Sequence, residues 1–594
     1  MLECFSRGLL FYVEVFGKRG VIIMIITMIS WGYIFCVSFC LGYAVLKLLS
    51  KVIPIPSLET LGIAGVVVTG LVSMTVYAEY FSIFYKVGGL CHGIMFIAFL
   101  ASFFIYRKEI VPIFKNQLVH DNRLKFVLCS IIFVTASFYS SRGQYHTDTG
   151  IYHAQAIRLL EEYGCLKGLG NFQLHFAYNS SYLALCALFT MSFILPQALH
   201  TMTGFFMVLF TGYAVSGLIR SKGHGWKGSD MARIAIIMYS VTVLDGLQSP
   251  ATDYGTIYMM MYIFTAWIVH AEEKKDKSED LALYGILSVF AIFTVSMKLS
   301  AAAIVLLAVV PLALLIRQKK FHLIVIYVLV GFLSFLPFLI RNVILSGYLI
   351  YPVTAIDLFD VVWKIPAEYV KVDSQQITAW GRALYDISKL DLPLAEWLPI
   401  WWGGQQVYGK FLIFSQAVGI CLVTFIFLRR VDRSHRLRND MIVFYITLLG
   451  GVALWFLTAP FIRYGLAYLL LLPMCALGDY FGEMFHRWQI RLLTIVFAVA
   501  VLFGPWTVNY IGDDIEFVQD YTKDGYIFWP IPFEDAETDI CEMDGVTVYN
   551  STDEEVNSYN YYPNTCYHDM MNRTELIGST IKEGFKPKDV TDGD

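Results

Sequence analysis

The feature that most constrains this chain is a succession of apolar runs, each close to the length of about 20 residues that crosses a bilayer as one helix. Because 57% of the 594 residues are hydrophobic and only 15% are charged, an ordinary soluble protein is excluded. We predict an all-α polytopic membrane protein with about 13 to 14 transmembrane helices. The expected crossings lie near residues 21–46, 58–80, 87–105, 124–140, 199–219, 231–249, 254–270, 281–297, 299–316, 321–340, 408–428, 441–458, 465–481 and 490–509.

Lysine and arginine residues between these runs predict the sidedness of the chain, because cytoplasmic loops carry an excess of both. They gather at 107–125, 220–227, 274–277, 317–320, 429–438 and 487–491. If the first two groups are both cytoplasmic, an even number of crossings lies between them, and 124–140 and 199–219 already supply two. We therefore expect Tyr182 to Leu195 to form a short helix in the outer leaflet and not a crossing.

A polar, charged and aromatic stretch from Ser141 to Ser181 follows the fourth expected crossing. Within it, Thr149 to Tyr163 places apolar residues on one face and charged residues, Glu161 among them, on the other, which predicts a short interfacial helix. Asp148 stands at the N-cap position of that helix. Its carboxylate either caps the helix or acts as a general base at the membrane surface, and the two roles are compatible.

Further polar residues stand at the ends of later runs, and the predicted topology puts them on the outer side together with Asp148. They are Asp253, Lys298, Arg341, Asn342 and Arg463. Each has a common structural explanation, since lysine side chains snorkel to the interface and arginine side chains end helices or bind lipid headgroups. Together, carboxylates and three cations on one face indicate a site for an anionic group.

Two regions outside the crossings are also expected on the outer side. Residues 346–407 are rich in tryptophan and proline, and we predict interfacial helices that cover the site. Residues 510–594 are polar and acidic, which predicts a small extracytoplasmic domain with strand-like segments such as Gly545 to Tyr549. Its Cys541 and Cys566 would pair if the domain lies outside the cytoplasm. The other expected units are N-terminal membrane helices at 1–120, a core at 121–345 with an outer loop at 141–198, and C-terminal membrane helices at 408–509.

Seven sequence runs carry a resemblance to a known group of proteins: HTDTGIYHAQAIRLLEEYG, GLGN, FAYNSSYL, SPATD, MKLSA, RNVILSGYLIYP and APFIRYG. They resemble an uncharacterised bacterial family of large membrane proteins with a core like that of the GT-C superfamily of membrane glycosyltransferases. The resemblance covers most of residues 120–470, and its first and sixth runs are the most specific. The chain departs from that superfamily in three additional spans at its start and in a lone Asp148, where many members carry two acidic residues. We therefore expect no cofactor and do not favour a divalent metal.

The resemblance implies transfer of a sugar from a polyprenyl-phosphate donor to a lipid-linked or cell-envelope glycan acceptor, on the outer side of a bacterial inner membrane. It implies that Asp148 is the general base and that the cations Lys298, Arg341 and Arg463 bind the donor phosphate. The residues expected to orient the substrates are His146, His153, Asp253 and Asn342.

Two other functions fit the same sequence. A transporter or flippase of a lipid-linked saccharide would need similar spans, but it would expose polar groups on both sides or at mid-bilayer. An envelope-glycan polymerase or ligase would share the outer site and differ in the size of its donor. The expected partners are membrane lipids, a polyprenyl-phosphate-linked sugar and a glycan or lipid-linked acceptor. Nucleic acid is not expected as a partner, and the sequence carries no glycine motif for nucleotide binding.

Overall fold

The computed structural model is mostly helical and describes residues 25–119, 123–141, 148–195, 197–220, 227–272, 279–431, 439–481, 533, 535–553 and 556–588. Eleven helical segments within these ranges are long and apolar enough to cross a membrane, so the chain is a multi-pass membrane protein. They are α2 (Ile25–Leu49), α3 (Leu58–Phe84), α4 (Gly89–Val119), α5 (Arg123–Ser140), α9 (Met202–Arg220), α12 (Asp280–Met297), η5 (Leu299–Ala308) continued by α13 (Val309–Arg317), α14 (Phe321–Ser346), α17 (Val407–Val431), α18 (Asn439–Thr458) and α19 (Ile462–Phe481).

Two of the predicted crossings are not among these eleven. Residues 231–249 form α10 (Gly228–Thr242) and the short turn η4 (Leu244–Gly246). At 15 residues, α10 is about 22 Å long, which is shorter than the hydrocarbon core of a bilayer. Residues 254–270 lie within α11 (Thr252–Glu272), which has 21 residues and is not among the eleven helices that are long and apolar enough to cross a membrane. The expected crossing at 490–509 lies outside the described residues.

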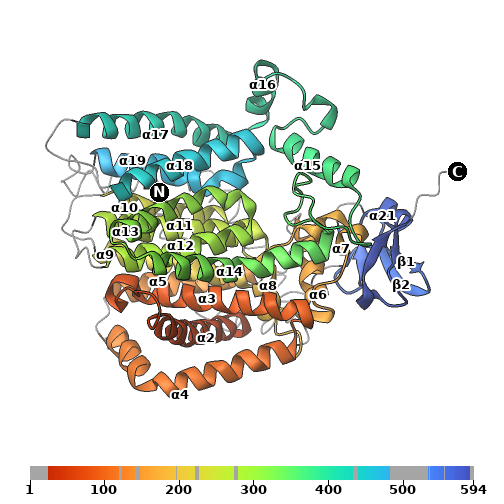
Figure 1. The fold of residues 1–594 in the computed structure, drawn as a ribbon, viewed down its shortest axis with the longest axis horizontal. Coiled ribbons are helices and arrows are strands. Elements are labelled where there is room, and N and C mark those ends of the chain that lie inside the picture. The colour runs from red at the N-terminus through yellow and green to blue at the C-terminus, as the bar shows by residue number, and fades with distance from the viewer. Residues whose placement is uncertain are drawn as a thin grey trace, which may run out of the picture.

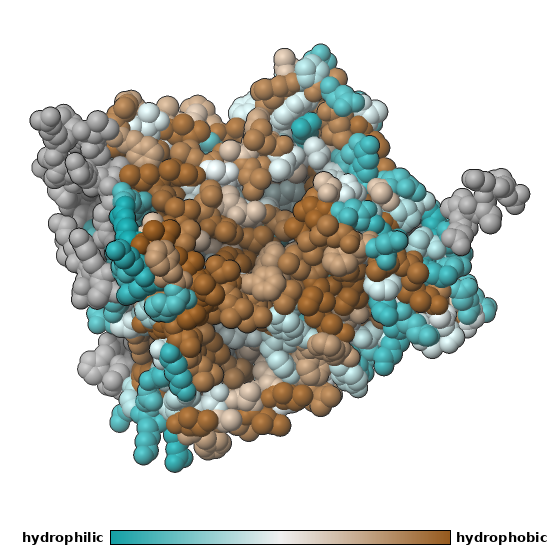
Figure 2. Space-filling view, in the orientation of Figure 1, coloured by the Kyte–Doolittle hydropathy of each residue, from teal (hydrophilic) through white to brown (hydrophobic). Residues whose placement is uncertain are grey.

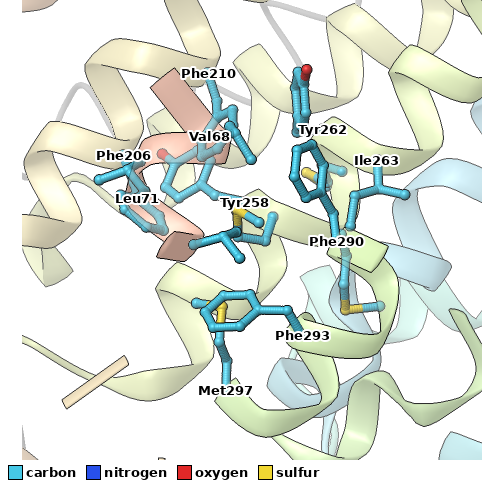
Figure 3. Close-up of a cluster of buried hydrophobic side chains, with 14 of the residues drawn as sticks. Val68, Leu71, Phe206, Phe210, Tyr258, Tyr262, Ile263, Phe290, Phe293 and Met297 are labelled. Carbon is cyan, nitrogen blue, oxygen red and sulfur yellow. The ribbon is translucent and has the colours of Figure 1, made fainter. Parts of the chain in front are cut away.

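The helix α11 lies at the centre of the bundle, where its aromatic side chains pack against α3, α9 and α12 (Figure 3). Each member of this cluster is at most 3% exposed. Because lipid chains are as apolar as these side chains, the cluster stabilises the bundle through close packing. Its members are Val68, Leu71, Phe206, Phe210, Tyr258, Tyr262, Ile263, Phe290, Phe293 and Met297.

The helices α2 and α3 approach so closely that glycine is required at their contact. A Cβ atom on Gly70 would lie 1.8 Å from the carbonyl oxygen of Ser38, and one on Gly42 would lie 2.0 Å from that of Val66. Small residues that allow close backbone approach are typical of helix pairs in membranes.

The segment from Tyr182 to Leu195 does not cross the membrane, as predicted. Its helix α8 (Ser181–Leu188) has eight residues and is about 12 Å long. All eight are buried, and the helix packs on α3 and on α6 (Ala154–Glu162). It therefore lies within the protein and not at its lipid-facing surface.

Short helical elements gather at one end of the bundle (Figure 1). The predicted interfacial helix at 149–163 consists of one π-helical turn, η2 (Thr149–His153), followed by α6. The loop at 346–407 contains helices, as predicted. The remaining elements of this group are α7 (Leu169–Phe172), η3 (Leu174–Ala177), α15 (Ala367–Gly381), η6 (Ile387–Lys389) and α16 (Leu394–Gly404).

Glu161 departs from the predicted polar face of the interfacial helix, because it is only 5% exposed. Its Oε1 accepts hydrogen bonds from the hydroxyl groups of Thr190 and, over 2.6 Å, of Ser192. Burial raises the pKa of Glu161 to about 7, and these hydrogen bonds oppose the shift. The prediction that Glu161 faces water is wrong, because the hydroxyl groups of Thr190 and Ser192, about 30 residues along the chain, solvate its carboxyl group in place of water.

The described part of the tail forms a small domain with two sheets at the same end of the bundle (Figure 1). Its strand β2 (Val546–Ser551) includes four of the five residues of the segment predicted to be strand-like, and Gly545 belongs to the turn before it. In the first sheet β2 pairs antiparallel with β1 and in parallel with β3, and the second sheet pairs β4 antiparallel with β5. Cys541 and Cys566 are free thiols, so they form no disulfide. The elements are β1 (Thr538–Met543), β2 (Val546–Ser551), β3 (Asn564–Thr565), α21 (His568–Arg573), β4 (Thr574–Leu576), η7 (Ile581–Glu583) and β5 (Phe585–Pro587).

The surface follows the same arrangement. Figure 2 shows an apolar band across the long helices, with hydrophilic residues at both ends of the band. This pattern is typical of a protein whose middle faces lipid and whose ends face water.

Candidate active site

Four residues that are far apart in the sequence form one group of ion pairs at the end of the bundle that carries the tail domain. Arg463 Nη1 lies 2.7 Å from Asp148 Oδ2, and Arg463 Nε lies 3.7 Å from Asp253 Oδ2. Lys298 Nζ lies 2.5 Å from Asp253 Oδ1. We name Asp148, Asp253, Lys298 and Arg463 the ion-pair cluster. Two carboxylates and two cations balance in charge, and Arg463 bridges both carboxylates.

Asp148 precedes the π turn η2, and its side chain makes no capping hydrogen bond to that turn. The capping role is therefore wrong, and the carboxylate pairs with Arg463 instead. The tail domain holds the turn: the Asn557 N–H donates to Gly150 O over 2.8 Å, and Asn557 Nδ2 donates to Ile151 O over 2.5 Å. Such π turns occur frequently at functional sites.

Asp253 and Lys298 stand where two neighbouring helices end. Asp253 is in the first turn of α11, and Lys298 is the C-cap residue of α12 with an extended backbone. The Lys298 ammonium group also lies 4.2 Å from the centre of the Tyr464 ring, a cation–π contact. The Lys298 side chain is 24% exposed and that of Asp253 is 7% exposed. Solvent therefore reaches the lysine more readily than its partner.

Arg463 is positioned by the loop that joins α18 to α19. Trp401 Nε1 of α16 donates to Pro460 O over 2.9 Å, and Trp455 Nε1 donates to Phe461 O over 2.7 Å. The outer helix α16 thus fixes the backbone just before Arg463. The Arg463 side chain is 35% exposed and that of Asp148 is 18% exposed, so both are accessible to a ligand.

A group of aromatic side chains lies near the cluster and was not singled out from the sequence. The rings of Tyr152 and His175 stack with their centres 5.3 Å apart, and the Tyr178 ring lies 5.3 Å from His175 and 5.7 Å from Tyr351. The hydroxyl groups of Tyr178 and Tyr351 donate to Asp373 over 2.6 and 2.8 Å. We name these five residues the aromatic wall. The one signal in the sequence is that three of them fall within the polar stretch 141–181.

The charges of the cluster act on this wall. Burial raises the pKa of Tyr152, and the negative charges of Asp148 and Asp253 raise it further. Burial lowers the pKa of His175, against the effect of Asp373 and Asp148, so this histidine is neutral at pH 7. Its Nδ1 atom is buried and has no hydrogen-bond partner within the described ranges.

Arg341 was expected among the cations of the site, and the structure does not bring it to the cluster. Its Nη1 lies 3.1 Å from Glu79 Oε1, and the two side chains are 3% and 0% exposed. Glu79 belongs to α3, so this ion pair joins two spans inside the bundle. The physical reason for the difference is that a charge inside the membrane needs a counter-charge, and Glu79 supplies it within the bundle, away from the cluster.

The residues expected to orient substrates are placed differently. Asp253 is in the cluster. His153 is 1% exposed, and the centre of its ring lies 4.0 Å from that of Tyr152 with the two planes tilted by 45°. Asn342 Nδ2 donates to Leu349 O over 3.1 Å, so this side chain holds the turn after α14. His146 lies outside the described residues.

The cluster also bears on metal binding. Within the ranges that the structure describes, no group of three or more histidine, cysteine, aspartate or glutamate side chains is arranged to hold a metal ion. The two carboxylates of the cluster face cations, and these cations can form charge-assisted hydrogen bonds with a phosphate.

Comparison with known proteins assigns the chain to a family without a described activity. The chain belongs to the family described as a domain of unknown function, DUF8201, whose family model matches residues 24–470. The matched range contains all four residues of the ion-pair cluster. No curated protein and no solved structure matches the chain.

Proposed function

We propose that this DUF8201 protein is a membrane glycosyltransferase that moves a sugar from a polyprenyl-phosphate donor to a lipid-linked or cell-envelope glycan acceptor. The observation that carries the proposal is the ion-pair cluster, in which a partly exposed carboxylate and two cations meet at one end of a membrane bundle. The resemblance of the surrounding sequence runs to GT-C glycosyltransferases supports it. We further propose that the cluster faces the extracytoplasmic side of a bacterial inner membrane.

In the proposed reaction an acceptor hydroxyl group attacks the anomeric carbon of the donor sugar. The new carbon–oxygen bond forms as the bond between the anomeric carbon and the phosphate oxygen breaks, with inversion at that carbon. Asp148 takes the hydroxyl proton, and polyprenyl phosphate leaves with the bonding electron pair. A phosphate leaving group needs no general acid, so Lys298 and Arg463 act by stabilising its negative charge.

Arg463 links donor binding to the base. In the free protein its guanidinium group is 2.7 Å from Asp148, so the cation occupies one oxygen of the proposed base. A bound donor phosphate competes for the same guanidinium group. The donor thereby releases Asp148 to accept the proton of the acceptor, while Asp253 keeps both cations in place.

The aromatic wall has the composition of a sugar-binding surface. Tyr152 and Tyr178 present flat apolar rings near the cluster, and the His175 ring lies against both. A ligand site of mainly apolar side chains with a few placed polar groups is the usual arrangement for small molecules. We assign the wall to holding the transferred sugar.

The alternative from a different class is a transporter or flippase, which needs a polar route through the bundle. The buried apolar cluster of Figure 3 lies along the middle of α11, between the ion-pair cluster and the far end of that helix, and this favours the enzyme. A polymerase or ligase would use the same cluster with a larger donor, so only the substrate separates it from a monosaccharide transferase.

The substitution Asp148→Asn tests the proposal, because it removes the base and keeps the size of the side chain. We expect transfer from polyprenyl-phosphate sugars by the purified protein to fall by about 10² to 10⁴-fold. The matched control is Asp391→Asn, an exposed residue of the loop at 346–407, which should keep full activity. Retained turnover in Asp148→Asn would refute the base, and donor binding by the wild type without any product would favour the transporter.

A further inference from the structure

A cavity of about 960 Å³ lies at the opposite end of α11 from the ion-pair cluster. The helix carries Asp253 in its first turn and Glu272 in its last, and Glu272 lines the cavity. A rise of 1.5 Å per residue puts roughly 28 Å between these two residues. The volume is at the upper end of the range for ligand sites, which extends to about 1,000 Å³. The cavity is thus separate from the proposed active site.

The lining of the cavity changes from apolar to basic along its length. On α9 it follows one face of the helix from Phe205 to Arg220, a path of about 22 Å. On α5 it runs from Phe133 to Lys125. The two helices run in opposite directions, yet both bring an aromatic residue to one end of the cavity and a basic residue to the other.

The basic end of the cavity has two cationic side chains that lie outside the salt bridges of the described residues. Arg220 and Lys227 line it and form no ion pair with any residue that the structure describes. Three carboxylates also line the cavity. Asp230 pairs with Arg233 at 2.8 Å, Glu272 accepts from the Ser229 N–H over 3.0 Å and lies within the influence of the Lys227 charge, and Glu59 is exposed.

One nitrogen atom at this end is also left without a partner. Arg233 lines the cavity with a side chain that is only 11% exposed. Its Nε is buried and has no hydrogen-bond partner in the described part of the chain. Buried donors of this kind normally have a partner, but this atom lies against Gly217 of α9, so only Arg220 and Lys227 are assigned to the anionic ligand.

We infer that this cavity binds one anionic lipid, with an apolar chain along α5 and α9 and a phosphate group at Arg220 and Lys227. A soluble anion would leave the apolar part unfilled, and an uncharged lipid would leave the cations unpaired. The shared chemistry is a phosphate group on a long apolar chain, which a phospholipid and a polyprenyl phosphate both have. The inference does not depend on glycosyl transfer, because it concerns the other end of the bundle.

The apolar end is tested by filling it. Gly32 lines the cavity, and a Cβ atom added there meets nothing within 4 Å. We expect wild-type protein to retain one phosphatidylglycerol or polyprenyl phosphate molecule in native mass spectrometry, and Gly32→Leu to lose it. The matched control is Gly93→Leu on α4, where a Cβ also meets nothing within 4 Å and the cavity is not involved. Equal lipid retention by the two variants would overturn the site.

The basic end is tested by removing its cations. In Arg220→Ala/Lys227→Ala, phosphatidylglycerol affinity should fall by about fivefold for each cation removed. The control Arg317→Ala/Lys320→Ala removes two cations that do not line the cavity and should leave affinity unchanged. Equal retention of phosphatidylcholine and phosphatidylglycerol by the wild type would overturn the anionic headgroup. Comparison of phosphatidylglycerol with polyprenyl phosphate in the wild type identifies which anionic lipid the site prefers.

Discussion

Two arginine residues at helix ends show how differently one side chain is used in this protein. Arg463 is 35% exposed and lies between two carboxylates, of which Asp148 is 18% exposed. Arg341 is 3% exposed and pairs with the fully buried Glu79. The first guanidinium group can exchange a protein carboxylate for a ligand, whereas the second has no access to one.

The difference in exposure between Arg463 and Arg341 separates a candidate ligand site from a structural ion pair. A charge inside a membrane protein is costly unless it is paired, and Arg341 and Glu79 satisfy each other between α14 and α3. An exposed ion pair contributes little to stability, so stability alone does not explain the convergence of four charged residues at the ion-pair cluster. The contrast between the two arginines therefore supports the proposal that the ion-pair cluster binds a ligand and that Arg341 has a packing role.

The largest expected effect is on the buried pair. Arg341→Met should lower the free energy of unfolding by about 3 to 5 kcal/mol, because it leaves the Glu79 carboxylate buried without a counter-charge. Thermal unfolding in detergent measures the loss. Arg463→Met should lower the same quantity by less than about 1 kcal/mol, since Asp148 is partly solvated and Asp253 keeps its ion pair with Lys298.

The double substitution Arg341→Met/Glu79→Gln is the matched control, because it removes both charges. It should recover most of the lost stability. If Arg463→Met proved as destabilising as Arg341→Met, the distinction between the two arginines would be lost.

The sequence predicts the ion-pair cluster well. Lysine and arginine sidedness was enough to place Asp148, Asp253, Lys298 and Arg463 at one end of the bundle, and their meeting in space agrees with that expectation. The same reasoning also excluded Tyr182 to Leu195 as a crossing. Such arguments succeed because helix ends are fixed by the length of apolar runs.

The burial of Arg341 could not be predicted in the same way, because it depends on contacts between segments that are far apart in the sequence. Glu79 is one acidic residue in a long apolar run, and only the packing of α3 against α14 makes it the partner of Arg341. The hold of Asn557 on the turn after Asp148 joins residues about 400 positions apart. The aromatic wall likewise combines distant segments, so its tyrosine residues could not be separated from ordinary interfacial aromatics.

Glu161 extends the comparison to a buried carboxyl group that is hydrogen-bonded to hydroxyl groups in place of a cation. Its partners are the hydroxyl groups of Thr190 and Ser192. Its pKa is raised from 4.5 to about 7 by burial. The neutral form is therefore favoured in the folded protein, and the stability it provides is full below about pH 4.5 and is lost as the pH rises through about 7. We expect the free energy of unfolding to fall by about 3 kcal/mol over this range.

Chemical denaturation at several pH values checks this expectation. Glu161→Gln should remove the pH dependence, since the amide does not titrate. Glu162→Gln is the control. Glu162 is the next residue in the chain, its side chain is 42% exposed, and its carboxylate lies 3.8 Å from Lys86 Nζ. An unchanged pH profile in Glu161→Gln would show that another group is responsible.

The smallest effect on stability is expected at Lys298, the cation of the cluster with an aromatic contact. Lys298→Met should change the free energy of unfolding by less than about 1 kcal/mol, because the lysine is partly exposed. If it binds the donor phosphate, the same variant should raise the KM for the polyprenyl-phosphate sugar and leave the KM for the acceptor unchanged. Lys364→Met is the matched control, since Lys364 is 23% exposed and pairs with Asp357 in the outer loop. An equal rise in both KM values, or the same rise in the control, would assign Lys298 to structure along with Arg341.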